Sequence, residues 1–348
     1  MNTNEIYIKR CLELSKKGLT QAMPNPSVGA VLVFKDSIIG EGYTSLYGGH
    51  HAEVNAINAV RDKTLLSKSI LYVSLEPCSH FGKTPPCADL IIKYKIPKVV
   101  IGIVDSNEKV SGKGVQKLID AGIVVEVGIL EKECYASNKR FFTYHTKKRP
   151  YIILKWAESL DGFIAPVNQT KLESFVISNE VSRQLVHKWR SEEQAILVGT
   201  NTVLKDNPKL NTRFWWGKNP IRIIIDKMQS IDTSYYVADN TIKTIVFSEQ
   251  INLQPAKNCH YEKVLFDDNL AQRICTILFK LEIQSLLIEG GAKTLQLFID
   301  ANLWDEARIF KSNVLLLNGV ACPQLIMQNF KKTSILKDTL STVYNHQQ

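Results

Sequence analysis

The feature that most constrains the fold is an alternation of short β-branched runs with amphipathic segments. The runs are too short for helices, and apolar side chains recur at helical spacing in the segments between them. In the first 130 residues the runs are VGAVLVF (28–34), ILYVSL (70–75), VVIGIV (99–104) and IVVEVGIL (123–130). The segments are AEVNAINAV (52–60), CADLIIKYK (87–95) and GVQKLIDAG (114–122). This alternation predicts a layered α/β domain.

The same pattern restarts after the charged stretch TKKRP (146–150). Strand-like runs follow at YIILKWA (151–157), AILVG (195–199), IRIIID (221–226), TIVFS (244–248) and SLLIEGG (285–291), with helices expected over 179–193 and 292–303. A chain of 348 residues is also too long for one ordinary hydrophobic core. We therefore predict two α/β domains, residues 1–147 and 148–348.

Composition excludes several classes of protein. With 45% hydrophobic and 22% charged residues the chain is globular, and no apolar run approaches the roughly 18 residues of a membrane span. The N-terminus has no signal-peptide h-region, so we expect a cytoplasmic protein without membrane association. Seven cysteines, an odd number and mostly isolated, argue against a disulfide framework. The net charge of +9 is spread out, so phosphorylated small substrates explain it as well as nucleic acid would.

Two short motifs in the first half contain candidate metal ligands. His51 and Glu53 form an H-x-E motif at the start of a predicted helix, and Cys78 and Cys87 lie in LEPCSHFGKTPPCADL (75–90). A catalytic zinc site of this kind uses one imidazole and two thiolates and leaves a position for water, whose pKa the metal lowers. Zinc deaminases add a glutamate that moves protons without binding the metal. The pattern predicts His51, Cys78 and Cys87 as ligands and Glu53 as the acid/base.

Two features of this pattern leave alternatives open. His50 competes with His51 for the ligand role, although its spacing to Glu53 is one residue longer than the motif requires. Eight residues separate Cys78 from Cys87, whereas the short zinc-deaminase signature is P-C-x-x-C. A longer loop can still close on one ion, so we expect a metal site whose inserted residues contact the substrate.

Three segments resemble the deaminase domain of the bifunctional riboflavin-biosynthesis enzyme, a diaminohydroxyphosphoribosylaminopyrimidine deaminase fused to a 5-amino-6-(5-phosphoribosylamino)uracil reductase. They are MPNPSVGAVLV, EGYTSLYGGHHAEVNAI and LEPCSHFGKTPPCADLI, and S-H-F-G-K-T-P-P-C is the most specific part. The resemblance implies a cytidine-deaminase-like α/β/α layered domain with one Zn²⁺ on His51, Cys78 and Cys87 and with Glu53 as the catalytic residue. The predicted substrate contacts are Asn25 in the PNP turn and His80, Lys83 and Thr84 in the loop between the cysteines.

The second half lacks the G-x-G-x-x-G dinucleotide fingerprint but has a Gly-Gly turn between SLLIEGG and AKTLQLF. Free backbone N–H groups and a helix dipole at such a turn suit a pyrophosphate. KWAESLDGFIA, SEEQAILVGTNTVLKDNPKLNTR, NPIRIIID and LLIEGGAKTL resemble, in that order, the reductase domain of the same family. That domain is similar in fold to dihydrofolate reductase, so the resemblance implies a second, dihydrofolate-reductase-like α/β domain.

The resemblance also implies NADPH as a second cofactor and a phosphorylated pyrimidine as the substrate. The matching cofactor positions are Glu158, Thr202, Asp206, Gly291, Ala292, Lys293, Thr294 and Leu295. The matching positions for the ribosyl phosphate are Ser174, Arg190, Leu210, Arg213 and Glu289, of which Arg190 and Arg213 suit phosphate as bidentate guanidinium groups. The sequence departs from the family pattern at Glu158, at Val176 and after Arg308.

These implications predict a bifunctional enzyme. Its first domain would hydrolytically deaminate 2,5-diamino-6-(5-phosphoribosylamino)pyrimidin-4(3H)-one, and its second would use NADPH to reduce the ribosyl group to a ribityl chain. We expect a homo-oligomer, a dimer or a tetramer, that binds no nucleic acid. One rival is a nucleic-acid-editing deaminase, for which FWWGK (214–218) is the only suggestive stretch. The other is a non-catalytic zinc scaffold, which would not need Glu53.

Overall fold

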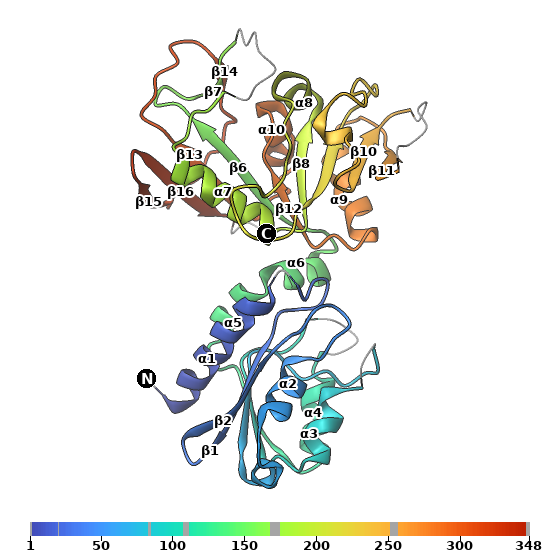
Figure 1. Ribbon diagram of the computed structural model, residues 1–348, viewed down its shortest axis with the longest axis vertical. Helices are drawn as coiled ribbons and strands as arrows, with labels where there is room; N and C mark the ends of the chain where they lie inside the picture. The colour runs from blue at the N-terminus through green and yellow to red at the C-terminus, as the bar shows by residue number, and fades with distance from the viewer. Residues whose placement is uncertain are drawn as a thin grey trace. The chain divides into compact units, whose positions relative to one another are not determined.

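The computed structural model describes residues 2–19, 21–82, 85–106, 111–167, 175–250 and 257–345. The chain divides into two compact units, Met1–Lys148 and Arg149–Gln348 (Figure 1). The boundary expected from the sequence, between residues 147 and 148, lies next to this division. Each unit has its own sheet, and no strand of one unit pairs with a strand of the other among the described residues.

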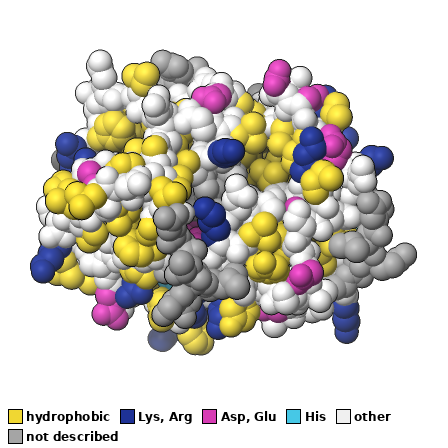
Figure 2. Space-filling model, turned by 90° about the horizontal axis from the view of Figure 1, so that it is seen from above, with side chains coloured by type: hydrophobic (Ala, Val, Ile, Leu, Met, Phe, Trp, Pro, Cys, Tyr) yellow, Lys and Arg dark blue, Asp and Glu magenta, His cyan; other side chains and the backbone are white. Residues whose placement is uncertain are grey.

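The face of the molecule shown in Figure 2 is of mixed character. On the face in Figure 2, Lys and Arg side chains lie mostly one by one among acidic and hydrophobic side chains. Within the described ranges, every helix is too short or too polar to cross a lipid bilayer.

The N-terminal unit is built on a five-stranded sheet with the strand order β2-β1-β3-β4-β5. Strand β1 pairs antiparallel with β2 and β3, whereas β3, β4 and β5 are parallel. The strands are β1 (Gly29–Phe34), β2 (Ser37–Tyr43), β3 (Ile70–Val73), β4 (Lys98–Ile101) and β5 (Val124–Val127). The parallel strands place their carboxyl ends at one edge of the sheet, where α/β folds usually bind ligands.

Helices cover both faces of this sheet, with α1 and α5 on one side and α2, α3 and α4 on the other (Figure 1). They are α1 (Thr3–Gly18), α2 (Ala52–Ala59), α3 (Cys87–Lys93), α4 (Lys113–Asp120), α5 (Glu131–Ser137) and α6 (Lys139–Lys147). A 3₁₀-helix, η1 (Lys63–Lys68), precedes β3. This arrangement confirms the predicted α/β/α layers.

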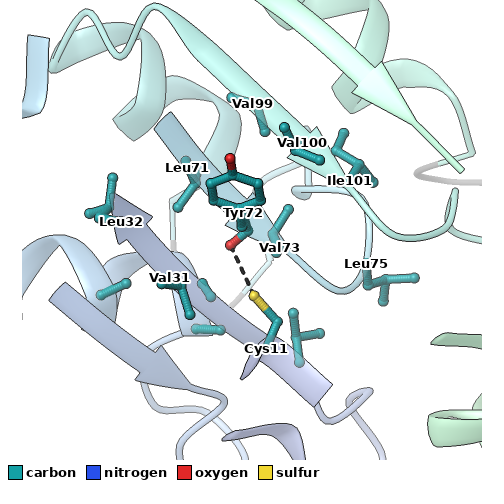
Figure 3. Packing of buried hydrophobic residues seen from close by; sticks show 14 of the residues in the cluster. Cys11, Val31, Leu32, Leu71, Tyr72, Val73, Leu75, Val99, Val100 and Ile101 are labelled. Carbon is teal, nitrogen blue, oxygen red and sulfur yellow. Dashed lines mark hydrogen bonds between the residues drawn. The ribbon is translucent and has the colours of Figure 1, made fainter. Parts of the chain in front are cut away.

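The core of this unit is one buried cluster that includes both faces of the sheet and the helices α1, α2, α3 and α4. Cys11 of α1 is fully buried, and its Sγ donates a hydrogen bond to the Tyr72 carbonyl at 3.4 Å (Figure 3). Val31 of β1 and Leu71 of β3 are also fully buried in this cluster. Burial raises the pKa of the Cys11 thiol well above its usual value, so Cys11 acts as a small apolar side chain in the core.

The C-terminal unit has a nine-stranded sheet with the order β11-β10-β9-β8-β12-β6-β13-β16-β15. The strands from β11 to β13 are parallel, and β16 and β15 continue the sheet antiparallel. They are β6 (Tyr151–Glu158), β8 (Ala195–Gly199), β9 (Ile221–Ile225), β10 (Thr244–Ser248), β11 (Cys259–Lys263), β12 (Ser285–Ile288), β13 (Glu306–Lys311), β15 (Lys331–Ile335) and β16 (Asp338–Tyr344). A separate antiparallel pair joins β7 (Phe163–Ala165) to β14 (Val320–Ala321).

Side chains of the central strand β6 alternate between the two faces of this sheet. Ile152 and Leu154 pack into one buried cluster and Ile153 into another, as expected for a strand that is covered on both sides. The first cluster is completed by α9 and α10, and the second by α7. The helices are α7 (Glu180–Glu192), α8 (Thr200–Asp206), α9 (Leu270–Lys280) and α10 (Ala292–Asp300), with the 3₁₀-helix η2 (Tyr236–Ala238).

Candidate metal centre and reductase cavity

His51, Cys78 and Cys87 lie together in the N-terminal unit. Nδ1 of His51 is 3.5 Å from Sγ of Cys78 and 3.4 Å from Sγ of Cys87, and the three ligand atoms all lie within 4.8 Å of one another. In the part of the chain that the structure describes, no other group of three or more His, Cys, Asp or Glu side chains is arranged to hold a metal ion. One imidazole and two thiolates are a donor set that suits zinc, so the residues present fit this metal.

Two helix starts and one strand end bring these side chains together. His51 is the N-cap of α2, Cys87 is the first residue of α3, and Cys78 follows the end of β3. The Cys87 backbone N–H donates to Cys78 Sγ at 3.3 Å, and hydrogen bonding with Cys87 and His51 lowers the pKa of Cys78. This makes Cys78 the more readily ionised thiol of the pair, as a metal ligand requires. His50, the alternative ligand, is exposed and lies outside the group.

Glu53 lies in the first turn of α2, beside the cluster. Its side chain is 3% exposed and interacts with both His51 and Cys87. Burial raises the pKa of Glu53 to about 7, against an attraction to His51 that lowers it. A buried carboxyl group in this position can accept a proton and give it back.

Of the four predicted substrate contacts of this unit, two lie among the described residues. Asn25 is half-buried in a turn in which its N–H donates to the Ala22 carbonyl at 2.9 Å, and His80 is exposed. Lys83 and Thr84 lie outside the described residues. All four residues stay predicted contacts.

Glu76, two residues before Cys78, was missed by the sequence reasoning. Its carboxylate is buried and accepts four backbone N–H groups, from Asp105 and Gly112 on one oxygen and from Gly114 and Val115 on the other, at 2.8–3.1 Å. A Cβ at Gly114 would lie 2.0 Å from the Pro77 carbonyl oxygen, so only glycine allows this approach. The segment before Cys78 is thereby held against the start of α4. A charged residue at an apolar strand end was the available signal, because burying it is costly unless it is hydrogen-bonded.

The C-terminal unit contains a cavity of about 1040 Å³ at the carboxyl ends of β6, β8 and β12. Eleven of the predicted residues line it, which are Arg190, Thr202, Asp206, Leu210, Arg213, Glu289, Gly291, Ala292, Lys293, Thr294 and Leu295. Ser174 lies outside the described residues. Glu158 is not part of the described lining, and its carboxylate accepts a hydrogen bond from Trp156 Nε1 at 2.9 Å.

Glycines bring the start of α10 close to β8. A Cβ on Gly290 would lie 2.7 Å from the Val198 side chain, and one on Gly199 would lie 2.4 Å from Thr294 Oγ1. Gly291 has φ 69°, a conformation that glycine adopts readily, and it is the N-cap of α10. The residues that begin α10 line the cavity, and the unpaired N–H groups of a helix start favour a phosphate group.

A buried ion-pair cluster forms another part of the cavity wall. Arg190 donates to Glu289 from Nε at 2.7 Å and from Nη2 at 2.8 Å, and Lys155 Nζ lies 3.6 Å from the same carboxylate. Burial alone would raise the pKa of Glu289, but the charges of Arg190 and Lys155 hold it at about 2. Burial lowers the pKa of Lys155. Glu289 is therefore an ionised group at the cavity wall at neutral pH.

Two protein-family models together match most of the chain. The cytidine and deoxycytidylate deaminase zinc-binding region matches residues 1–103, and the RibD C-terminal domain matches residues 150–342. Riboflavin biosynthesis protein RibD of Aquifex aeolicus is 39% identical over 331 residues, covering 94% of this chain and 92% of its own. RibD of Bacillus amyloliquefaciens is 38% identical over 330 residues, covering 92% and 87%.

Solved structures agree with these relatives over both units. A diaminohydroxyphosphoribosylaminopyrimidine deaminase/5-amino-6-(5-phosphoribosylamino)uracil reductase from Thermotoga maritima superposes with a TM-score of 0.89 at 37% identity and covers 98% of each chain. RibD of Acinetobacter baumannii gives a TM-score of 0.87 at 30% identity, with 98% of each chain covered. The chain therefore belongs to the RibD family of bifunctional riboflavin-biosynthesis enzymes, which combine a zinc-dependent deaminase with an NADPH-dependent reductase.

Proposed function

We propose that His51, Cys78 and Cys87 hold the zinc ion of the deaminase and that Glu53 transfers the protons of the reaction. The observation that carries this proposal is the convergence of one imidazole nitrogen and two sulfurs within 4.8 Å, beside a buried carboxyl group. Zinc in such a site supplies an activated water molecule for hydrolysis. With zinc bound, Glu53 would accept a proton from that water and return it to the departing amino group.

The substrate of this reaction is 2,5-diamino-6-(5-phosphoribosylamino)pyrimidin-4(3H)-one, and the product is 5-amino-6-(5-phosphoribosylamino)uracil with ammonia. We propose Asn25, His80, Lys83 and Thr84 as contacts of the pyrimidine and its substituents. A half-buried amide at Asn25 can pair with the polar edge of the ring, since it offers both donors and an acceptor.

The C-terminal cavity is proposed as the site where this product is reduced. NADPH, which supplies a hydride, would lie along Thr202, Asp206 and the start of α10 at Gly291–Leu295. Glu289, kept ionised by Arg190 and Lys155, can accept hydrogen bonds from sugar hydroxyls. Arg213 is proposed to bind the phosphate, and Leu210 to pack against the substrate. Ser174 and Glu158 remain predicted contacts.

The remaining features of the proposal concern location and partners. We propose a cytoplasmic homo-oligomer, a dimer or a tetramer, that acts on a small pyrimidine and not on nucleic acid. Of the aromatic stretch that suggested nucleic acid, Phe214 lines the reductase cavity and packs against His187, with ring centroids 4.8 Å apart. Phe214 therefore has a place in the small-molecule site.

Incubation of the purified protein with the diaminopyrimidine phosphate tests both activities. We expect ammonia release with or without NADPH, and oxidation of NADPH only as the deaminated product accumulates. Supplying the deaminated compound directly should remove the lag in NADPH oxidation. Absence of ammonia would contradict the deaminase, and NADPH oxidation that runs ahead of ammonia release would contradict the proposed order.

Replacing Arg213 with alanine should weaken binding of the reductase substrate far more than binding of NADPH. Arg213 Nη1 bonds to Asn211 Oδ1 at 3.0 Å, and burial and the nearby charges of Arg190 and Arg183 lower its pKa. Loss of a charged hydrogen bond to phosphate should raise KM for the substrate about 10- to 100-fold. KM for NADPH should change by less than about 2-fold.

The matched control for this variant is Arg273→Ala, which removes an exposed arginine paired with Asp267 in the same unit. It should leave both constants unchanged. An equal loss for substrate and NADPH in Arg213→Ala would show a general disturbance of the cavity and would count against phosphate binding by this residue.

A further inference from the structure

One face of α7 presents three basic side chains to the reductase cavity. Arg183, His187 and Arg190 are four and three residues apart, so they lie on the same side of the helix. All three line the cavity, as does Arg213, which follows α8 in the chain. Of these four residues, Arg183 and His187 were not predicted from the sequence.

Arg183 and His187 each have a buried polar atom without a hydrogen-bond partner. Nε of Arg183 and Nδ1 of His187 bond to no atom of the described residues. His187 is only 4% exposed, with its ring against Phe214. Native structures rarely leave a buried donor or acceptor alone, because the lost hydration is not replaced. Two such atoms in one cavity wall therefore indicate a ligand that supplies their partners.

The charges around these atoms indicate what kind of ligand this is. Arg190 is already bonded to Glu289 through Nε and Nη2 and to the Asn211 carbonyl through Nη1 at 3.1 Å, and Lys155 shares the same carboxylate. The positive charges of Arg183 and Arg213 are not balanced by Glu289 in this way. Burial first, and then the charges of Arg190 and Arg183, lower the pKa of Arg213, which shows how closely the cations are placed. An anion with several acceptor oxygens, such as a phosphate monoester, balances this charge.

We propose that Arg183 and His187 complete the phosphate subsite of the reductase, together with Arg213 and the remaining N–H groups of Arg190. This rests on the proposed function, because it requires the phosphoribosyl substrate to bind in this cavity. Arg183 donates from Nε–H to a phosphate oxygen. His187, as a neutral imidazole with its proton on Nδ1, donates to a second phosphate oxygen.

His187 binds phosphate as a neutral donor. Burial, followed by the charges of Arg190 and Arg213, lowers the pKa of His187 to about 4, while Glu289 acts in the opposite direction. The free imidazole is therefore neutral at pH 7.5. A phosphate monoester is mainly a dianion at that pH, since its second pKa is about 6. A neutral imidazole already carries one N–H, so with its proton on Nδ1 it can donate to the phosphate dianion without proton uptake from the solvent.

Reduction of two substrates by matched variants tests the role of Arg183. Arg183→Gln should raise KM about 10- to 100-fold for 5-amino-6-(5-phosphoribosylamino)uracil and less than about 2-fold for its dephosphorylated analogue. KM for NADPH should not change. Lys188→Gln removes a positive charge from the side of α7 that faces Trp215 and serves as the control. Equal losses on both substrates would reduce Arg183 to a structural role and overturn the proposal. A wild-type protein that reduces neither substrate would instead contradict the proposed function.

Calorimetric titration tests the role of His187. The reductase substrate is added without NADPH at pH 7.5, in two buffers that differ in ionisation enthalpy, so that proton uptake can be separated from binding heat. The wild type should bind about 10-fold more tightly than His187→Phe, which keeps an aromatic ring but has no ring nitrogen, and His187 should add no proton uptake. His187→Asn, whose neutral amide can donate to phosphate, should recover part of the affinity. Equal affinities of the wild type and His187→Phe would overturn the assignment of His187.

Discussion

Glu53→Gln will stop ammonia release and leave about one zinc ion bound per chain. The amide keeps the size of the carboxyl group but cannot take up and return a proton. Glu53 is not one of the three grouped ligand side chains, so the metal should stay. General acid–base catalysis typically contributes about 10²- to 10⁴-fold, and the same carboxyl serves more than one proton transfer here, so we expect a loss at the upper end of that range or beyond. Ammonia release and metal analysis of the same preparation measure both outcomes.

The second activity of the chain provides an internal control for this variant. Glu53 belongs to the N-terminal unit, so oxidation of NADPH with the already deaminated substrate should proceed at the wild-type rate. Glu13→Gln, a matched change at an exposed position of α1, should leave ammonia release unchanged. Undiminished ammonia release by Glu53→Gln would contradict the catalytic role of Glu53. Loss of zinc from this variant would indicate that Glu53 is itself a metal ligand.

The metal centre could be predicted from the sequence because each part of it has a local sequence signal. His51 and Glu53 are only two residues apart at the start of a helix, so they stay close together in any fold that contains that helix. Cys78 and Cys87 follow a strand end and open a helix. The unusual loop between them still closes, because the Ala88 N–H bonds to the Cys78 carbonyl at 3.1 Å. The two-part α/β organisation was accessible for a similar reason, since strand and helix periods are local properties.

Features that depend on tertiary contact were not predicted. Strand β2 has the sequence SIIGEGY, whose two glycines weaken any strand signal. These glycines are required by packing, because Cβ atoms at Gly40 and Gly42 would lie 2.4 and 2.3 Å from backbone carbonyl oxygens of α2. Strand β15 is mostly exposed and has no apolar alternation, so its place depends on pairing with β16. The roles of Glu76, Arg183 and His187 could be recognised only from the groups that surround their side chains in the folded chain.

Glu289→Gln should lower the free energy of unfolding of the C-terminal unit by about 3 kcal/mol at pH 7. The carboxylate is 6% exposed and balances Arg190 and Lys155, which are 12% and 14% exposed. A neutral amide of the same shape would leave both cations buried without a counter-charge. Urea unfolding followed by tryptophan fluorescence measures this unit alone, because all five tryptophans of the chain lie between residues 156 and 304. Glu282→Gln, an exposed change beside β12, should shift stability by no more than about 0.5 kcal/mol.

The pH dependence of this difference separates the ion pair from a loss of packing. The pKa of Glu289 is about 2 in the folded protein against a usual value of 4.5. A lowered carboxyl pKa contributes stability that is complete above about pH 4.5 and is lost as the pH falls toward 2. The difference between wild type and Glu289→Gln should therefore be constant from about pH 6 to 8 and shrink below about pH 4.5. Because a packing defect does not titrate, a difference that persists undiminished at about pH 3 would show that shape, and not charge, makes Glu289 necessary.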